Sequence, residues 1–479
     1  GGIHYEMQQQ AFSNVNNFVM AENVSDVTVA TIKENSLSLP GVEIVETSTR
    51  SYEQGTVLPH VLGRVGKITA EKWKVTDENG QTTYPLRDKG YNMNDVIGIS
   101  GLESAYEDEL RGKDGVETIT RNSDGVIVST AMTTVPEPGH TVQLTVNSDF
   151  QKAVEQALGK NIDMISRAYG TDGARANAGA VVVLDVHTGE IRAMASLPSY
   201  DPTNVVAALE DPDSPLINRA LMPYCVGSSF KLAVAAAALE QGIPPSFSVD
   251  CVGGTTVAGR IFYCHNHAGH RQTNLRRAIE QSCNPYFIKL GQKAGAQALL
   301  GMAQALGFGQ ETVLAEGIIA RQGTLPSLEE LANPHELANF SFGQGKLTAT
   351  PVQVAAMVSA VANGGLAVSP KLVLGSTTDG STLEPQQQTA PVRVFSERTA
   401  QILREDMIGV VEQGSATMAK PQQGGAGGKT ASAQTGILDE DGEEVVHAWF
   451  AGFFPAQQPR YAAVVLIEGG EYGGQVASP

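Results

Sequence analysis

A serine and a lysine at the start of an alanine-rich segment constrain this chain more than any other feature. Ser228 and Lys231 are followed by residues 232–240, which contain four consecutive alanines and neither Gly nor Pro. Such a segment predicts a helix, and a spacing of three places both side chains on one helical face. A lysine whose pKa is lowered by burial can take the proton of a serine hydroxyl and make it a nucleophile. Alone, the pair is more often a helix cap beside a solvated lysine, so the rest of the chain decides.

The composition is that of a folded protein with more than one domain. The chain has 479 residues, of which 42% are hydrophobic and 18% charged. Its net charge of −18 and the lack of a basic block argue against nucleic acid as a main partner. No segment approaches the roughly 18 apolar residues that a membrane span needs, and no signal peptide opens the chain.

The N-terminal region, residues 1–145, is predicted to be rich in strands. Residues 27–32 and 42–45 are β-branched segments separated by the turn Pro40-Gly41, and glycines bracket a short predicted helix within residues 98–112. Two prolines near residue 137 give the best boundary in this half, so the domains are placed at 1–145 and 146–479.

The C-terminal region has a different pattern. A helix through residues 151–158 is predicted to be capped by Ser148 or Asp149. Strands are predicted at 180–186, 191–196, 446–454 and 461–467. Helices are predicted around 229–241, 274–294, 295–306, 351–363 and 396–412. Strands, then helices, then strands indicate an α+β fold, an antiparallel sheet with helices segregated against it.

Two polar motifs follow Ser228 along the chain. Ser282 begins a Ser-x-Asn triplet 54 residues later (282 − 228), and Lys429 begins a Lys-Thr-Ala triplet 147 residues after that (429 − 282). Glycines before Lys429 are also typical of phosphate-binding loops, but such a loop requires a helix after it. An acidic turn and a predicted strand follow here instead, so we reject nucleotide binding.

The ordered set of three motifs resembles that of the penicillin-interacting serine acyltransferases. Residues 342–345 and 447–452 are similar to segments of the penicillin-binding protein transpeptidase domain, and residues 50–52 and 100–112 resemble the non-catalytic domain of its class B members. The chain is identified as a class B penicillin-binding protein. The resemblance implies a serine β-lactamase-like transpeptidase domain at 146–479 and an elongated, β-rich pedestal or dimerisation domain at 1–145.

The resemblance also implies the chemistry. Ser228 would attack a stem peptide ending in D-Ala-D-Ala, and Lys231 would take its proton. Ser282 would pass a proton to the leaving amine, and Lys429 would supply a positive field. The substrate-binding residues would be Asn284 for an amide and Thr430 and Ser432 for the terminal carboxylate. The backbone N–H groups of Ser228 and Ser432 would form the oxyanion hole, and no cofactor would be required.

Rival functions remain open at this point. A D,D-carboxypeptidase or a β-lactamase would pass the acyl group to water, for which Glu316 and Glu329 are candidate activators. The other alternative is a catalytically silent binding protein, either a β-lactam sensor or a scaffold. The expected partners are stem peptides, strands derived from lipid II, β-lactams and a SEDS-family glycosyltransferase. The expected location is the extracytoplasmic face of the bacterial membrane, through an N-terminal anchor that this chain does not include.

A possible metal site lies around the second motif. Four residues form the pattern Cys-x12-Cys-x5-His-x12-Cys: Cys251, Cys264, His270 and Cys283. Their types suit a closed tetrahedral zinc site, whereas a Cys251–Cys264 disulfide or free thiols are the alternatives. Some class B penicillin-binding proteins that this chain resembles carry zinc beside the Ser-x-Asn loop. His265 and His267 are expected to be exposed loop residues.

One position departs from the family pattern. Residue 431 is alanine where the third motif usually has glycine, and a methyl group there can crowd a ligand that approaches the strand. We therefore expect slower acylation by bulky cephalosporins than in an Ala431→Gly variant.

Overall fold

The structure, a computed structural model, describes residues 7, 18–36, 38–45, 49–53, 55–123, 127–169, 176–387, 389–439 and 442–478. The chain divides into two compact units, residues 1–55 with 63–107 and residues 56–62 with 108–479. Within the described ranges no helix has the length and apolar character needed to cross a bilayer.

The smaller unit combines short helices with paired strands. β1 (Arg64–Lys67) pairs antiparallel with β4 (Val96–Ser100), and β2 (Val75–Thr76) pairs with β3 (Thr82–Thr83). The helices are α2 (Asp26–Glu34), α4 (Ala70–Trp73), α5 (Pro85–Asp88) and α6 (Gly101–Ala105). Ile68, Tyr91 and Ile97 form its small core. The buried Glu103 carboxylate pairs with Arg50 at 2.8 Å, which offsets the cost of removing it from water.

The two strands predicted near the N-terminus are wrong. Residues 27–32 lie in α2, and residues 42–45 form no strand. Ser25 caps α2 by accepting a hydrogen bond from the backbone N–H of Thr28 at 3.2 Å, and Asp26 stands in the first turn. Both features favour a helix. β-branched residues need a partner strand to express their strand preference, and none of the residues in α2 is buried.

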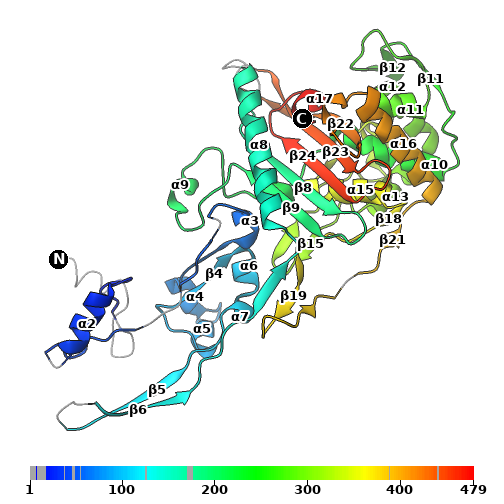
Figure 1. The fold of residues 1–479 in the computed structure, drawn as a ribbon. Coiled ribbons are helices and arrows are strands. Elements are labelled where there is room, and N and C mark those ends of the chain that lie inside the picture. Colours follow the sequence, from blue (N-terminus) through cyan, green and yellow to red (C-terminus); the bar gives the residue numbers. More distant parts are fainter. Residues whose placement is uncertain are drawn as a thin grey trace. The chain divides into compact units, whose positions relative to one another are not determined.

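The larger unit is built on a five-stranded antiparallel sheet (Figure 1). The sequence predicts an antiparallel sheet with four of these strands, and it does not predict the fifth, at 427–438. The strand order in the sheet is β22 (Gly427–Leu438), β23 (Glu444–Phe454), β24 (Tyr461–Ile467), β8 (Gly179–Asp185) and β9 (Ile191–Leu197). β22 is therefore an edge strand, so alternate backbone N–H groups along it point away from β23.

Helices cover both faces of this sheet (Figure 1). α8 (Ser148–Tyr169) packs Leu158 and Ile162 against Val181 and Val183 on one face. The helices α10 (Lys231–Glu240), α13 (Ala296–Ala305), α15 (Pro351–Ala362) and α16 (Glu397–Gln413) lie on the other side. The cap of α8 is Asn147, and not Ser148 or Asp149 as predicted, because the Asn147 Oδ1 accepts from the N–H of Phe150 at 2.9 Å.

The predicted helix at 274–294 is broken in two. α11 (Leu275–Glu280) ends before the Ser-x-Asn triplet, and α12 (Asn284–Ala294) begins within it. Pro285 stands in the first turn of α12, where its missing N–H costs nothing. The break places Ser282 outside both helices.

Residues before the predicted boundary at 145/146 also take part in the larger unit. β7 (Thr141–Leu144) pairs with β19 (Val373–Thr377), and β5 (Val116–Arg121) forms an exposed hairpin with β6 (Ile127–Thr134).

Candidate active site

The predicted nucleophile lies in a tight turn beside the edge strand. The 3₁₀ turn Gly227–Phe230 carries the half-buried Ser228, and α10 begins directly after it. Gly227 has φ +58°, and a Cβ there would lie 3.0 Å from the Cβ of Ala433 on β22. Only glycine suits both this backbone and this close approach. The turn therefore brings Ser228 against β22.

Lys231 is fully buried and points to the second motif. Its Nζ donates to the carbonyl oxygen of Ser282 at 2.8 Å, to Asn284 Oδ1 at 2.7 Å and to Ser282 Oγ at 3.2 Å. Within the described ranges, no hydrogen bond joins this ammonium to the Ser228 hydroxyl. Burial lowers the pKa of Lys231 to about 8, against the opposing effect of Cys283 and Cys264.

Ser282 occupies a strained backbone position between α11 and α12. Its φ is +51°, which is uncommon for a residue other than glycine. The carbonyl of Ile279 accepts from its N–H at 3.3 Å, so the end of α11 holds the turn. The strain fixes the hydroxyl where two lysines reach it.

Lys429 approaches the same hydroxyl from β22. Its Nζ donates to Ser282 Oγ at 2.9 Å and to the carbonyl oxygen of Thr430 at 2.7 Å, and the side chain is fully buried. Burial lowers the pKa of Lys429 well below its ordinary value, and the charge of Lys231 adds to this effect.

Asn284 is held from both sides. Its Oδ1 accepts from Lys231, and its Nδ2 donates to the backbone carbonyl of Tyr263 at 3.1 Å. Tyr263 could not be selected from the sequence, because the contact uses only a backbone atom.

Thr430 and Ser432 share one side of β22, since side chains two residues apart point the same way. Thr430 Oγ1 lies 2.7 Å from Ser415 Oγ, and the N–H of Gly473 donates to Ser432 Oγ at 3.2 Å. Sequence reasoning missed Ser415 and Gly473, which are distant in the chain and belong to no motif.

Ala431 points away from these hydroxyls. Its side chain is only 3% exposed, and a Cβ on Gly227 would lie 3.3 Å from its methyl group. The methyl therefore fills space beside the turn that carries Ser228.

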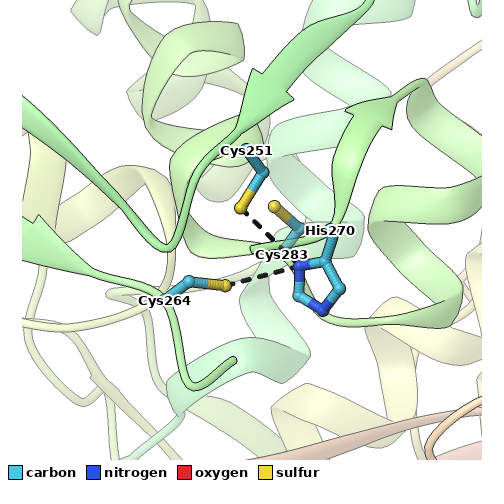
Figure 2. Close-up of side chains that lie close together, drawn as sticks. All are labelled: Cys251, Cys264, His270 and Cys283. Atoms are coloured by element: carbon cyan, nitrogen blue, oxygen red, sulfur yellow. Dashed lines mark hydrogen bonds between the residues drawn. The ribbon is translucent and has the colours of Figure 1, made fainter. Parts of the chain in front are cut away.

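The four predicted metal ligands come together (Figure 2). The side chains of Cys251, Cys264, His270 and Cys283 are all buried, and their ligand atoms lie within 4.8 Å of one another. His270 Nδ1 lies 3.5 Å from the Sγ of Cys264 and 3.7 Å from that of Cys251. All four cysteines of the chain are among the described residues and none forms a disulfide, so the predicted alternative of a Cys251–Cys264 disulfide is wrong in this structure.

The cluster adjoins the second motif. Cys283 is the middle residue of the Ser-x-Asn triplet, and Cys264 follows Tyr263, whose carbonyl holds Asn284. A hydrogen bond between the two thiols lowers the pKa of Cys264 and raises that of Cys283. His265 and His267 are exposed.

The structure thus brings three predicted catalytic side chains and one predicted substrate-binding side chain into one hydrogen-bonded group: Lys231, Ser282, Lys429 and Asn284. Ser228 lies beside this group at the start of the helix that carries Lys231. Glu316 and Glu329 are exposed, and no hydrogen bond or ion pair joins either to these residues in the described part of the chain.

Comparison with known proteins agrees with this geometry. The family described as "Penicillin binding protein transpeptidase domain" matches residues 179–479, and that described as "Penicillin-binding Protein dimerisation domain" matches residues 2–144. Stage V sporulation protein D of Bacillus subtilis is 31% identical over 93% of this chain, which spans 64% of that protein.

Two further relatives are similar over nearly the whole chain. Peptidoglycan D,D-transpeptidase MrdA of Escherichia coli is 28% identical, over 95% of this chain and 74% of that protein. A solved structure on the coordination of polymerization and crosslinking by a peptidoglycan synthase complex has a TM-score of 0.78 and 28% identity, over 99% of this chain and 83% of that one. From its motifs, fold and relatives, this chain belongs to the penicillin-binding proteins, as a class B member with a D,D-transpeptidase domain.

Proposed function

We propose that this protein cross-links peptidoglycan stem peptides through an acyl-enzyme on Ser228. The observation that carries this proposal is the single hydroxyl of Ser282, which accepts from two buried lysines, Lys231 at 3.2 Å and Lys429 at 2.9 Å. Through this hydroxyl, a proton that Lys231 takes from Ser228 can pass to a leaving amine without a water molecule.

In the first step, the Ser228 oxygen attacks the carbonyl carbon of the bond between the two terminal D-alanines. Lys231 takes the hydroxyl proton, for which it must first be neutral. With a pKa of about 8, about a tenth of Lys231 is neutral at pH 7. An unshifted lysine, with a pKa near 10.4, would be neutral in less than about 0.1% of molecules.

In the second step, the C–N bond breaks and the departing amine needs a proton. Ser282 lies within hydrogen-bond distance of Lys231, so it can donate its own proton and recover one from the Lys231 ammonium. Lys429 donates to the same hydroxyl and, while it is protonated, would supply a positive field beside this path. D-Ala leaves, and an ester of Ser228 remains.

The developing oxyanion would be stabilised by the backbone N–H groups of Ser228 and Ser432. β22 is an edge strand, and its residues Ala431 and Ala433 lie close to Gly227, which supports an outward N–H of this strand as the second donor. Loss of one such donor costs about 3–4 kcal/mol in other serine enzymes. Asn284 would bind the substrate amide, and the hydroxyls of Thr430 and Ser432 would bind the terminal carboxylate.

The amine of a second stem peptide then attacks the ester, forms the cross-link and frees Ser228. The exposed positions of Glu316 and Glu329 support an amine acceptor over water, because neither carboxylate meets the site residues in the described ranges. β-Lactams would acylate the same serine, which makes them inhibitors. The natural substrates would be strands derived from lipid II.

We also propose that the four-residue cluster binds one structural zinc ion. Zinc bonds of about 2.3 Å to sulfur and 2.05 Å to nitrogen, at tetrahedral angles, put the two ligand atoms about 3.6 Å apart. The observed separations from His270 Nδ1 are 3.5 and 3.7 Å. The ion would take no part in the reaction. It would fix Cys283, and with it the flanking Ser282 and Asn284.

The assignment of partner and place rests on the relatives. A solved structure of a peptidoglycan synthase complex resembles this chain, which supports a SEDS-family glycosyltransferase as its partner. An N-terminal anchor would hold the catalytic domain at the extracytoplasmic face of the membrane. We place the functional boundary between the pedestal and catalytic domains at 145/146.

Intact-mass spectrometry after incubation with benzylpenicillin tests the function. A lasting adduct on the wild type and none on Ser228→Ala is expected, and it would show slow deacylation. Drug hydrolysed without a lasting adduct would indicate a β-lactamase. An unmodified protein with intact drug would indicate a silent scaffold.

A further inference from the structure

Glu280 joins the end of α11 to the end of α16 by hydrogen bonds. This side chain is 8% exposed, and its Oε1 accepts from Arg276 Nε at 2.9 Å and from Gln413 Nε2 at 3.1 Å. Its backbone carbonyl accepts from the N–H of Ser415 at 3.1 Å. One residue therefore holds the last turn of α16 and the segment that follows it.

Two glycines leave the space that Glu280 occupies. A Cβ on Gly409 would lie 2.3 Å from Glu280 Oε1, and a Cβ on Gly414 would lie 2.6 Å from the Glu280 carbonyl oxygen. Any other residue at either position would push Glu280 away. The close packing means that the segment after α16 has one position relative to α11.

The segment after α16 carries Ser415 to the third motif. Ser415 Oγ lies 2.7 Å from Thr430 Oγ1, and Thr430 is 6% exposed. Lys429, the residue before Thr430 on β22, donates to Ser282. Ser282 lies two residues after Glu280 in the chain. Hydrogen bonds and chain connections thus link Glu280, Ser415, Thr430, Lys429 and Ser282 in a closed ring. This ring joins the second and third motifs through the end of α16.

We infer that Ser415, held in place by Glu280, is a positioning residue that orients the Thr430 hydroxyl toward the carboxylate of the ligand. This inference rests on the proposed role of Thr430. Either hydroxyl could donate in the bond between Ser415 and Thr430. A hydroxyl carries one proton, so Thr430 can donate to a carboxylate and keep this bond only if Ser415 is the donor. In the inferred arrangement Ser415 donates, and a hydrogen bond received by Thr430 strengthens the one that it gives.

The test compares two ligands that differ in one charge. Benzylpenicillin has a free carboxylate, and its methyl ester does not. We expect Ser415→Ala to slow acylation by benzylpenicillin about 3- to 10-fold, the value of one hydrogen bond between neutral groups, with less than about a twofold effect on the ester. Ser415→Thr keeps the hydroxyl and should restore the rate.

A double-mutant cycle with Thr430→Val separates positioning from general damage. Once the Thr430 hydroxyl is gone, Ser415→Ala should have no further effect on either ligand. Equal slowing with both ligands, or effects of the two substitutions that multiply, would overturn the inference. A wild type that forms no adduct would instead overturn the proposed function, so the two failures are distinguishable.

Variants of Glu280 test whether this residue holds Ser415 in place. Glu280→Gln keeps the Oε1 acceptor and should behave as wild type, whereas Glu280→Asp cannot reach Gln413 and should lose preference for benzylpenicillin over its ester. Glu405→Ala, which removes an exposed carboxylate on α16, is the matched control. An unchanged preference in Glu280→Asp, with the protein folded, would show that Glu280 does not position Ser415.

Discussion

Lys231 and Lys429 share one acceptor, the hydroxyl of Ser282. The two Nζ atoms reach it at 3.2 and 2.9 Å from different elements, Lys231 from α10 and Lys429 from β22. Both side chains are fully buried. Burial lowers the pKa of both lysines, and the charge of Lys231 lowers that of Lys429 further. The fold creates the proton acceptor by burying Lys231 beside Ser282.

The first prediction concerns the pH dependence of acylation. The pKa of Lys231 is about 8, and only its neutral form accepts the proton of Ser228. The rate of acylation by benzylpenicillin should therefore rise about tenfold per pH unit below pH 7 and level off above about 8. The midpoint belongs to the coupled lysine pair, not to one residue.

Stopped-flow acylation between pH 6 and 9 measures this profile. Lys231→Arg is the informative variant, because a guanidinium keeps its charge over the whole range and should abolish the rise together with most of the activity. A flat profile for the wild type would show that another group accepts the proton.

The second prediction concerns Ala431 and Gly227. The methyl group of Ala431 is buried beside Gly227, so Ala431→Gly should change acylation by bulky cephalosporins by less than about threefold. The same change should lower the free energy of unfolding by about 1 kcal/mol, the value of a buried methyl group. This differs from the crowding expected from the sequence, and faster cephalosporin acylation in Ala431→Gly would restore that expectation.

Gly227→Ala is the reciprocal test. The new Cβ would meet the Cβ of Ala433 at 3.0 Å on a backbone with φ +58°. We expect a loss of about 1–2 kcal/mol in stability. A displaced Ser228 should also slow acylation about 100-fold or more, since a shift near 1 Å has this effect. Normal acylation would show that the turn adapts.

The third prediction concerns the metal. Elemental analysis of protein purified without chelator should find one zinc per chain, and a strong chelator should lower both the melting temperature and the acylation rate. Cys251→Ser should lose the ion. Cys225→Ser is the matched control, since this free, half-buried cysteine lies outside the cluster. Metal-free wild type with full activity would count against the site.

The fourth prediction concerns Asp406 on α16. Burial raises the pKa of this carboxyl to about 7, with Arg276 opposing the shift and Glu280 and Glu405 adding to it. Its Oδ2 is buried and has no hydrogen-bond partner within the described ranges. The folded protein thus binds this proton more tightly than the unfolded chain, so stability falls as pH rises from about 4 to 7.

Asp406→Asn removes this dependence. The variant should match the wild type near pH 4 and exceed it above pH 7 by on the order of 2 kcal/mol. Thermal melts at both pH values measure the difference. Glu397→Gln is the control, because Glu397 is an exposed carboxylate on α16 that does not contribute to the pKa shift of Asp406. An equal gain at pH 4 and pH 8 would mean that folding does not raise the pKa of this carboxyl.

Regular structure in the catalytic half was predictable because its pattern is local. The alanine-rich segment after Lys231 became α10, and the apolar runs at 180–186 and 461–467 became β8 and β24. The failures lie where local signals conflict. The valines and threonines of residues 27–32 favour a strand, but Ser25 and Asp26 start a helix there, and no neighbouring strand competes for it.

The sequence by itself determined the identities and order of the reacting groups and the ligand types of the metal cluster. These follow from residue chemistry and spacing, which remain the same in any fold. It also predicted the sheet with helices against it, because apolar periodicity reports which faces are buried.

Only the tertiary structure decided what each group touches. Glu280, Ser415 and the carbonyl of Tyr263 belong to no motif, and they act through contacts between segments far apart in the chain. The direction of the Ala431 methyl and the lowered pKa of both lysines likewise depend on burial. The burial of one particular side chain depends on how distant segments pack around it, so no local pattern could predict it.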